Sequence, residues 1–331
     1  MDYYGIDIHK KYSTYTRVNE KGKIMEQGKI DNNVQEFQSI LNCSDGRAKV
    51  VIEATSNWYY IHDMIESMVE EVVVAHPLRT KAIASAKVKT DKIDATTLAQ
   101  LLRADLIPQS YIPPIEIREL RELLRYRASL VRIRTKVKNK VHAILIKNGL
   151  NHPFSDLFGK QGRSWLSGIE LAPVYRLSLD GYLSLIDYLN EQIKPITQQI
   201  DNQAKKDPRA EILESIPGIG HYSAMMIISE IGDIHRFPTA ANLVSYAGLN
   251  PAVHSSGGVT RYGRISKQGS SWLRWILIEV ASIASRHSEK FRIFHKRIAF
   301  KHGIKTANIA LARKILSIMY YLLLREESYR E

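Results

Sequence analysis

Cysteine is almost absent from this chain of 331 residues, since Cys43 is the single one. One thiol excludes an intramolecular disulfide and any zinc site built on pairs of cysteines. The eleven histidines are scattered, without the HxxxH spacing of a helical metal site. The phosphate-binding loop GxxxxGK[ST] is missing too, and with it the usual sequence signature of ATP hydrolysis.

Long apolar runs are also missing. The longest one, ILSIMYYLLL at 315–324, is about half of the roughly 20 residues that a membrane-spanning helix needs. The first residues, MDYYGIDIHK, are acidic and aromatic where a signal peptide has a basic start followed by an apolar stretch. We therefore expect a cytoplasmic protein.

Negative charge is scarce relative to positive charge. The chain has 47 Lys and Arg against 34 Asp and Glu, which gives a net charge of +13 and a pI of about 9.6. A surplus of this size predicts a polyanionic partner, with nucleic acid ahead of an anionic membrane surface. Hydrophobic residues make up 44% of the chain, so it is expected to fold, and its length fits two or three domains.

Residues 1–109 predict an α/β domain with a mixed sheet. We expect strands at 3–9, 13–19, 22–30, 48–54 and 70–77, and helices at 31–41, 57–69, 78–89 and 91–104. The first three strands leave no room for helices between them, which predicts an antiparallel meander. The proline-rich stretch IPQSYIPP then indicates a linker.

Residues 110–205 predict a helical arm. Apolar residues step by three and four from Leu130 to Ile144 within the run 117–147, and again from Tyr182 to Ile200, with a loop expected around 149–168 and the second helix beginning near Ser178. Narrow apolar seams on two long helices indicate an antiparallel coiled coil, with an ordinary helical bundle as the alternative. Residues 206–331 show no strand pattern and predict an all-α domain.

Four carboxylates of the first domain are the candidates for a metal site. Asp7 lies inside an apolar strand, which is costly unless the acid is paired or binds a metal. Glu53 ends a buried strand, and Asp91 and Asp94 stand three apart on one face at the start of a helix. Taken singly, each acid is explained as a helix cap or a solvated strand end.

The four acids meet if the first and fourth strands are neighbours and the last helix packs on that sheet. Four converging carboxylates need hard divalent cations, chiefly Mg²⁺, to offset their mutual repulsion. Two such ions are the usual device for displacement at a phosphodiester. The order and number of these acids on a basic chain favour this metal site over four separate caps.

The last domain holds two segments with nucleic-acid character. SIPGIGHYSAMMIISEIGD at 215–233 has the turn of a helix-hairpin-helix, in which Gly218 and Gly220 let the backbone approach a phosphate; a tight turn between packed helices is the alternative. From Ile234 to Ile278 there is no Asp or Glu. The cations of this stretch that we expect to bind nucleic acid are Arg236, Arg261, Arg264, Lys267 and Arg274. Its aromatic residues are expected in the core or stacked on a base.

These segments resemble a known family. The order of a strand Asp, a strand Glu and Asp-x-x-Asp on a helix resembles the RuvC branch of the RNase H-like nucleases. More narrowly, GIDIHKKYSTYTRVNEKGKI, VVIEATSNWYYIHDMI and AHPLRTKAIASAKVKTDKIDATTLAQLL resemble the DEDD transposases of bacterial insertion sequences. The resemblance implies an RNase H-like (RuvC-like) first domain in which Asp7, Glu53, Asp91 and Asp94 bind Mg²⁺ or Mn²⁺.

The stretch GLNPAVHSSGGVTRYGRISKQGSSWLRWIL resembles the second conserved region of the same transposases, in which a Ser followed by Gly is the nucleophile. Ser256 is the best match, with Ser255 as the alternative, and the resemblance implies a covalent phosphoserine with DNA. On composition alone the two serines read as a plain loop. Which group deprotonates the serine is open, with the neighbouring His254 and a bound metal as candidates.

The family is associated with recombination guided by a structured bridge RNA. The resemblance therefore implies a bacterial, nucleoid-associated transposase that acts on element ends and target DNA as a homodimer or tetramer with composite active sites. Two other functions compete with this one. The first is a RuvC-like junction-resolving nuclease that uses water as nucleophile, and the second is a non-catalytic nucleic-acid-binding protein whose acids are structural.

Overall fold

The computed structural model describes residues 1–42, 47–55, 57–84, 90–256 and 258–331. For residues 254–256, 259, 260 and 262 it describes the backbone without the side chains. The chain divides into two units, Met1–Ile112 and Pro113–Glu331, and each is described by itself.

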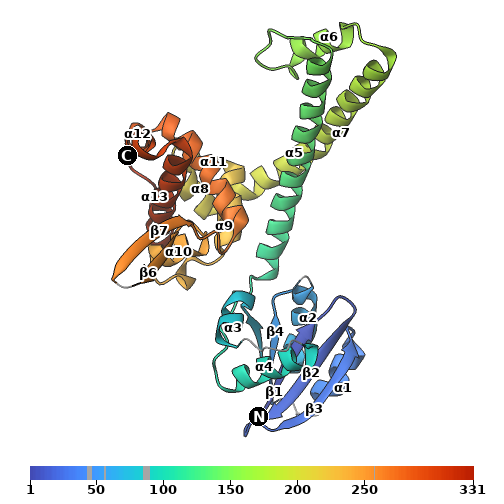
Figure 1. Cartoon of the computed structure of the whole chain (residues 1–331), viewed down its shortest axis with the longest axis vertical. Coiled ribbons are helices and arrows are strands. Elements are labelled where there is room, and N and C mark those ends of the chain that lie inside the picture. The colour runs from blue at the N-terminus through green and yellow to red at the C-terminus, as the bar shows by residue number, and fades with distance from the viewer. Residues whose placement is uncertain (43–46, 56, 85–89, 257) are drawn as a thin grey trace. The chain divides into compact units, whose positions relative to one another are not determined.

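The first unit is built on a mixed sheet with the strand order β3-β2-β1-β4-β5 (Figure 1). Its first three strands form an antiparallel meander, and β4 and β5 extend the sheet in parallel from β1. The strands are β1 (Asp2–Ile8), β2 (Tyr12–Asn19), β3 (Ile24–Asp31), β4 (Ala48–Glu53) and β5 (Glu71–Ala75). The predicted mixed sheet, its meander and the pairing of the first and fourth strands are confirmed.

Helices cover both faces of this sheet. One face buries Tyr4 and Ile6 of β1 against Phe37 of α1 (Val34–Leu41) and Ile61 of α2 (Trp58–Ile65). The opposite face packs on α4 (Asp91–Arg103), chiefly through Leu98. The short helices η2 (Glu66–Met68) and α3 (Pro77–Ile83) flank β5. The sheet therefore has a separate apolar layer on each side, with α1 and α2 on one face of β1 and α4 on the other.

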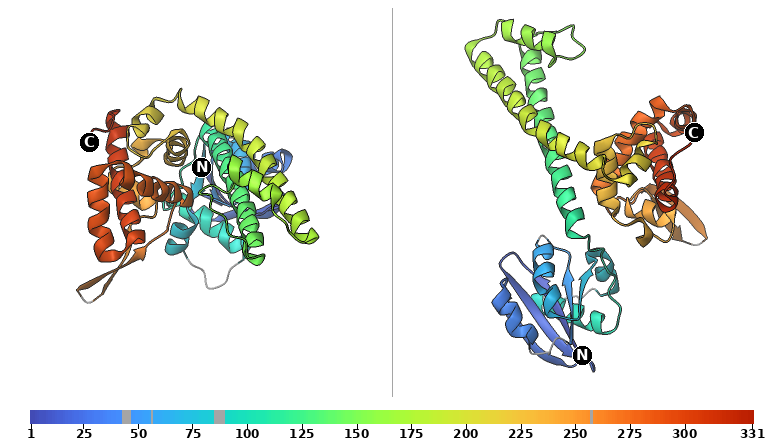
Figure 2. Two further views of the ribbon diagram at one scale, coloured as in Figure 1. Left: turned by 90° about the horizontal axis from the view of Figure 1, so that it is seen from above. Right: turned by 180° about the vertical axis from the view of Figure 1, so that it is seen from behind.

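The second unit begins with two long helices, α5 (Ile115–Lys147) and α7 (Pro173–Ala204), which run side by side in opposite directions (Figure 2). Val137 and Val141 of α5 pack against Leu183 and Ile186 of α7. The region predicted as a loop contains a helix, α6 (Lys160–Gly168), and α7 begins five residues before the predicted start. A proline at the first turn of a helix needs no hydrogen bond from its nitrogen, so Pro173 begins α7 instead of ending a loop.

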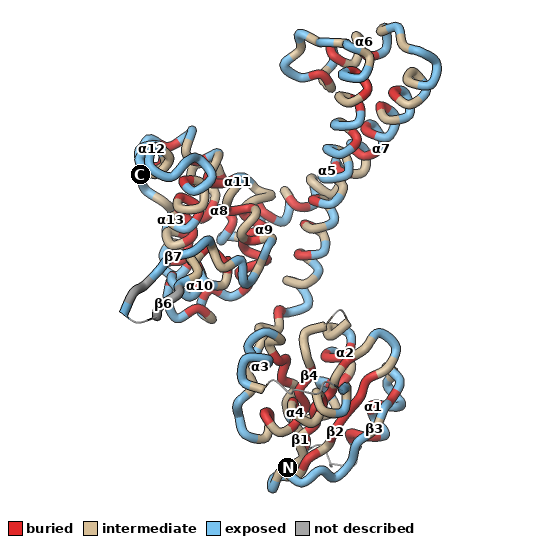
Figure 3. Tube along the Cα trace, in the orientation of Figure 1, coloured by how far each residue is buried: buried red, intermediate tan, exposed pale blue. Residues whose placement is uncertain are grey.

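The rest of the second unit is a helical domain with one large apolar core. Its elements are α8 (Pro208–Glu214), α9 (His221–Ile231), η3 (Ile234–Arg236), α10 (Ala240–Tyr246), α11 (Ser271–His287), α12 (Glu289–His302) and α13 (Ile304–Arg325). Among the described residues, α13 alone has the length and apolarity of a membrane span. Its face with Leu311, Ile315 and Met319 is fully buried in the domain core, which is the placement of a core helix (Figure 3).

The prediction of an all-α last domain is wrong at one place. β6 (Pro251–Ser256) and β7 (Val259–Ile265) pair as an antiparallel hairpin between α10 and α11. A strand can be recognised in a sequence by alternating apolar and polar residues only when one of its faces is buried. Here Val253, Arg261 and Arg264 are exposed, so the hairpin carries no such alternation and its sequence reads as a loop.

Candidate functional site

The parallel pairing of β1 with β4 positions Asp7 and Glu53. The two strands are in register from Asp2 opposite Ala48 to Ile6 opposite Ile52, and Asp7 and Glu53 are the next residue of each strand. Successive side chains of a strand point to opposite faces. Ile6 and Ile52 belong to the core beneath α1 and α2, so both carboxylates point to the face that α4 covers.

Helix α4 lies directly on β1 at Gly5. A Cβ atom at this glycine would lie 2.1 Å from the carbonyl oxygen of Ala95, so no other residue leaves room for the helix there. A hydroxyl pair, Thr16 with Thr96 at 3.1 Å, ties the same helix to β2. Thr90 is the N-cap of the helix, and its hydroxyl accepts a hydrogen bond from the backbone N–H of Ile93. Since Thr90 is the cap, capping does not account for the two aspartates in the first turn.

Three of the four predicted acids line one cavity of about 320 Å³. Asp7 comes from β1, Glu53 from β4 and Asp94 from α4, while α3 contributes Thr80 and Lys81 to the wall. Thr80 is 6% exposed, and its hydroxyl has no hydrogen-bond partner among the described residues. The cavity thus combines three carboxylates with a buried, unsatisfied hydroxyl.

Asp91 is joined to this cavity through a histidine. The Nε2 atom of His9 lies 3.3 Å from Oδ2 of Asp7 and 3.1 Å from Oδ2 of Asp91. One ligand atom from each of the three residues lies within 4.8 Å of the others. The structure therefore brings Asp7 together with all three other acids, with Glu53 and Asp94 across the cavity and with Asp91 by way of His9.

His9 is the residue of this site that the sequence analysis missed. Its backbone carbonyl accepts hydrogen bonds from the side chains of Asn32 at 2.7 Å and Asn57 at 3.3 Å. Its ring packs against Tyr12 with the centroids 4.6 Å apart. The signal was available, because His9 follows Asp7 by two residues and so has the same strand parity.

These donors fit a divalent cation. Carboxylate and hydroxyl oxygens are hard ligands, which suit Mg²⁺ or Mn²⁺ better than they suit metals that prefer sulfur. Carboxylates that share one cavity repel one another, and a cation among them removes that cost. A neutral imidazole beside Asp7 and Asp91 is compatible with the same ions. On its chemistry, the site accommodates the metal that the four acids predict.

Ser256 is the last residue of β6. Its backbone pairs with Val259 across the turn, in which Gly258 has a left-handed φ of +78°. The side chains of Ser255 and Ser256, and the whole of Gly257, lie outside the described residues. The structure thus places the backbone of the candidate nucleophile at the tip of the exposed hairpin.

The predicted nucleic-acid-binding cations divide into two groups. Arg261, Arg264 and Lys267 are exposed on or just after β7. Arg236 instead donates to the Ile231 carbonyl at 2.9 Å, and Arg274 donates to a backbone carbonyl as well, at 3.0 Å. Burial lowers the pKa of the Arg274 guanidinium from its ordinary value. The first group is available to a ligand, whereas the second group supports the fold.

The glycines of the helix-hairpin-helix motif are placed differently from each other. Gly218 has a φ of +94° and backs onto α11, where an added Cβ would lie 2.8 Å from the backbone nitrogen of Ala284. Gly220 is open and precedes α9. His221 is the first residue of α9. Its Nδ1 atom lies 3.4 Å from Oδ1 of Asp201, and its Nε2 atom lies 3.6 Å from Oε2 of Glu214. Two carboxylates beside this helix start oppose a phosphate, so the geometry here is that of a tight turn between packed helices.

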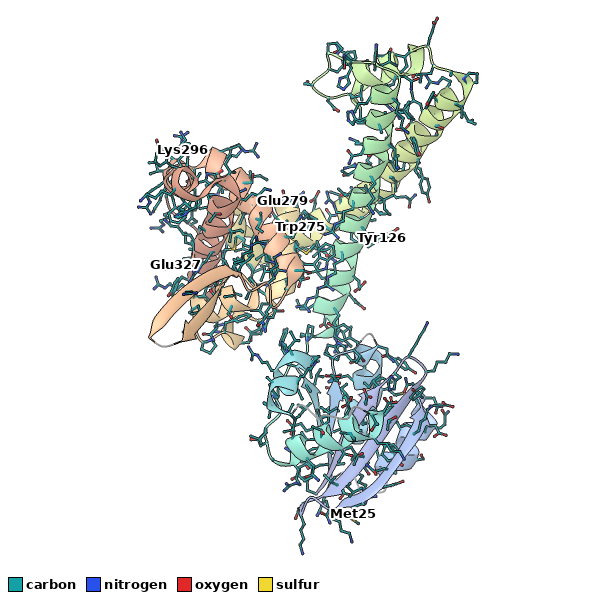
Figure 4. The ribbon with its side chains drawn as sticks, viewed as in Figure 1. Met25, Tyr126, Trp275, Glu279, Lys296 and Glu327 are labelled. Carbon is teal, nitrogen blue, oxygen red and sulfur yellow. The ribbon has the colours of Figure 1, made fainter. Side chains whose placement is uncertain are left out.

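An arginine of the arm packs against two tryptophans of α11. The guanidinium of Arg132 lies 4.3 Å from the ring centroid of Trp272 and 5.4 Å from that of Trp275. Figure 4 shows Trp275 on the side of the helical domain that faces the arm. These rings therefore join α5 to the domain. The sequence had left two roles open for the aromatic residues, packing in the core or stacking on a base, and for these two the role is structural.

The comparisons with known proteins identify two transposase domains in the chain. Residues 4–147 match the family of IS110-type DEDD transposases, and residues 210–296 match the "Transposase IS116/IS110/IS902 family". The chain is 26% identical to the "Transposase for insertion sequence element IS1111A" of Coxiella burnetii, over 98% of this chain and 90% of that protein. It is 26% identical to the IS1328 transposase of Yersinia enterocolitica, over 90% and 85% of the two chains. It is 27% identical to the "Pilin gene-inverting protein" of Moraxella bovis, over 96% and 94%.

Proposed function

Because this chain carries the two transposase domains of the IS110/IS116 family, we propose that it cleaves and rejoins DNA strands at insertion-sequence ends through a phosphoserine intermediate. The observation that carries the proposal is the meeting of Asp7, Glu53 and Asp94 in one cavity, with Asp91 joined to it through His9. DNA is the substrate, and the catalytic groups come from both units.

The four acids would hold Mg²⁺ or Mn²⁺. Bound there, the metal offsets the charge that develops on the phosphoryl oxygens and on the leaving oxygen during displacement. Asp7 would be one of the ligands and is the acid that meets the others, because it lines the cavity with Glu53 and Asp94 and its Oδ2 lies 3.3 Å from Nε2 of His9. Gly5 fixes the distance between the strand ligands and the helix ligands, because it sets how closely α4 approaches β1.

Ser256 supplies the nucleophile. Its Oγ forms a bond to phosphorus while the bond from phosphorus to one deoxyribose oxygen breaks, and that oxygen leaves as a hydroxyl after taking up a proton. A hydroxyl of the second DNA strand then attacks the phosphoserine and releases the serine with its proton restored. Each step exchanges one phosphate ester for another, so no ATP is consumed.

The name of one relative favours a recombinase over a nuclease. The Moraxella protein is named for inverting a pilin gene, and inversion requires that cut strands are joined again. Hydrolysis by water would leave the strands open, whereas a phosphoserine keeps the ester for rejoining. The relative aligns with nearly the whole chain, so the proposal extends the same chemistry to both units.

A structured guide RNA and a homodimer or tetramer complete the proposal. Support for a polyanion along the arm comes from α5, where Lys136 and Lys140 are exposed one turn apart. No Asp or Glu occurs between Leu123 and Ser155. The acids lie in the first unit and Ser256 in the second, so a composite site can combine two protomers. A nucleoid-associated place in the bacterial cytoplasm follows from the DNA substrate.

Covalent trapping tests the proposal. Labelled element-end DNA is incubated with the protein, Mg²⁺ and the candidate RNA, and the mixture is run on a denaturing gel. We expect a labelled protein band that is absent in Ser256→Ala and in Asp7→Asn and present in Ser255→Ala, which is the matched control. Cleaved DNA without attached protein, undiminished in Ser256→Ala, would overturn the serine mechanism in favour of a nuclease that uses water. A band lost only in Ser255→Ala would move the nucleophile by one residue.

A further inference from the structure

A groove of about 900 Å³ lies between the base of the β6–β7 hairpin and the helices α12 and α13. We call it the α13 groove. Its rim carries Arg264 and Lys267 from the hairpin side and Arg313 and Lys314 from α13. None of the residues that line it is acidic. The two α13 cations belong to no motif that the sequence analysis singled out.

The charge of the groove comes from two stretches that are far apart in sequence. Asp and Glu are absent from Ile234 to Ile278, which contains the hairpin, and they are absent again from Lys290 to Arg325, which contains most of α12 and all of α13. The fold brings these stretches together at the groove. Four cations without a counter-charge among the lining residues favour a polyanion as the ligand.

The floor of the groove is apolar. Phe294 of α12 and Ile309 of α13 line it, together with Leu249 and Ile265 from the hairpin side. The ammonium group of Lys314 lies 4.4 Å from the ring centroid of Phe294, which holds this cation at the edge of the apolar floor. A phosphate at the rim and a flat apolar group on the floor can therefore be bound at once.

Lys267 is presented to the groove by a strained backbone. Its φ is +55°, a left-handed conformation that residues other than glycine rarely adopt. The backbone nitrogen of Lys267 donates to the Gly248 carbonyl at 3.2 Å, and Ser270 donates to the Tyr246 carbonyl at 3.1 Å. Two hydrogen bonds to the end of α10 thus hold a strained lysine at a ligand site, a pattern that is typical of functional positions.

We propose that the α13 groove binds single-stranded DNA, with an unstacked base on the apolar floor and the flanking phosphates on the four cations. A duplex stacks the flat faces of its bases inside and exposes only their edges in the grooves, so the apolar floor would gain little from it, whereas an unpaired base exposes an apolar face. This is a second contact for the substrate, separate from the metal site.

The identification of the strand as DNA rests on the proposed function. Pro251 and Ile265 pair at the base of the hairpin beside the groove, and Ser256 lies five residues along β6. At about 3.4 Å per residue this is roughly 17 Å. A strand that is unpaired for attack at Ser256 therefore reaches the groove without a long detour. The groove would hold the displaced strand next to the point of cleavage.

Binding of a fluorescent single-stranded oligonucleotide of mixed sequence tests the groove. Anisotropy is measured with the full chain in EDTA over a range of salt concentrations, so neither metal nor chemistry enters. The test variant is the double substitution Arg313→Gln with Lys314→Gln. The matched control is Lys296→Gln with Lys301→Gln, because these exposed cations lie on α12 outside the groove lining, and Figure 4 shows Lys296 away from the hairpin. Circular dichroism checks that each variant is folded.

We expect the groove variant to bind the single strand about 10–100-fold more weakly than the wild type and the control variant to lose less than about 3-fold. The slope of log affinity against log salt should fall by about 1.4, because each phosphate contact on a single strand contributes about 0.7. Replacing Ile309 by Asn, which leaves the charge unchanged, should weaken binding with the slope unaltered.

Three outcomes would overturn the inference. They are equal losses in both double variants, a loss for duplex DNA that is as large as the loss for the single strand, and a loss for single-stranded RNA with none for DNA. The result is separate from the proposed function. If the chain binds single-stranded DNA through the groove but forms no phosphoserine, the groove proposal stands and the proposed mechanism fails. If the groove variant binds DNA normally and still cleaves it, the groove proposal fails and the mechanism stands.

Discussion

Gly5 of β1 lies so close to Ala95 of α4 that a Cβ atom on the glycine would come within 2.1 Å of the Ala95 carbonyl oxygen and 2.4 Å of the Ala99 nitrogen. Both atoms belong to the helix backbone, which cannot move aside as a side chain can. This contact sets the depth at which α4 sits on the sheet, and Asp94 is the residue before Ala95. The metal site therefore depends on a residue that carries no functional group.

Replacement of Gly5 by Ala should push α4 away from the sheet and separate Asp94 from Asp7. We expect a destabilisation of about 1–3 kcal/mol, as for overpacked cores, together with a loss of Mn²⁺ binding measured by electron paramagnetic resonance. Gly181→Ala is the control, because Gly181 is an exposed glycine within α7 with open space around it. That change should stabilise by about 0.5–1 kcal/mol. Normal Mn²⁺ affinity in Gly5→Ala would show that the close approach does not position the site.

The carboxylate cavity should make stability depend on divalent ions in a characteristic way. Asp94→Asn removes one of several neighbouring negative charges, so we expect its melting temperature in EDTA to exceed that of the wild type. The wild type should gain about 2.7 kcal/mol at a Mg²⁺ concentration 100 times the dissociation constant, and the variant should gain little. Asp31→Asn, on the exposed end of β3, is the control and should behave as the wild type. Equal Mg²⁺ gains in Asp94→Asn and the wild type would remove Asp94 from the ligand set.

His9 should act as a positioning residue that ties Asp91 to Asp7. Its loss in His9→Ala should weaken Mn²⁺ affinity about 10–100-fold, which is typical when a group that orients a metal ligand is removed. His9→Gln places an amide near the former Nε2 atom and should restore part of the affinity. A purely structural role would instead lower the melting temperature equally in both variants and leave Mn²⁺ affinity unchanged, so the two measurements together decide between the roles.

Glu230 and Arg125 form an ion pair that links the arm to the helical domain. The Glu230 carboxylate is 2% exposed and accepts hydrogen bonds from Arg125 at 2.7 Å and Ser270 at 2.8 Å, whereas the Arg125 side chain is 33% exposed. Substitution of the two partners should therefore lower the free energy of unfolding by unequal amounts. Arg125→Met leaves the buried Glu230 carboxylate with Ser270 as its remaining partner among the described residues, and should cost about 3–5 kcal/mol.

The reverse change should cost less, because Glu230→Gln leaves Arg125 able to reach water. We expect about 1 kcal/mol, the value of one hydrogen bond. Denaturant titration followed by tryptophan fluorescence reports on this ion pair, since Trp272 lies 5.8 Å from the Arg125 guanidinium. Arg292→Met, in the exposed pair with Glu289, is the control and should cost less than about 1 kcal/mol. Equal costs for Arg125→Met and Glu230→Gln would contradict the unequal burial of the two partners.

Much of the first unit could be read from local patterns. The β-branched and aromatic runs predicted the strands, and the short connections predicted the meander. That Asp7 and Glu53 meet was predicted only on the condition that the first and fourth strands are neighbours, which the structure confirms. The cap of α4 was placed wrongly by the local reading, which took the aspartates as caps, whereas Thr90 is the N-cap of the helix. The exposed hairpin was not legible, since strands without a buried face carry no alternating pattern.

The sequence by itself determined the order of the four acids, the positive charge and the family to which these point, because each of these is a property of residue identity and local spacing. Only the tertiary structure decided that His9 links Asp91 to Asp7, that Arg236 and Arg274 serve the fold, and that α13 completes a cationic groove with the hairpin. Local periodicity fixes which face a side chain occupies. What that face meets depends on how distant segments pack, and a single sequence does not record that packing.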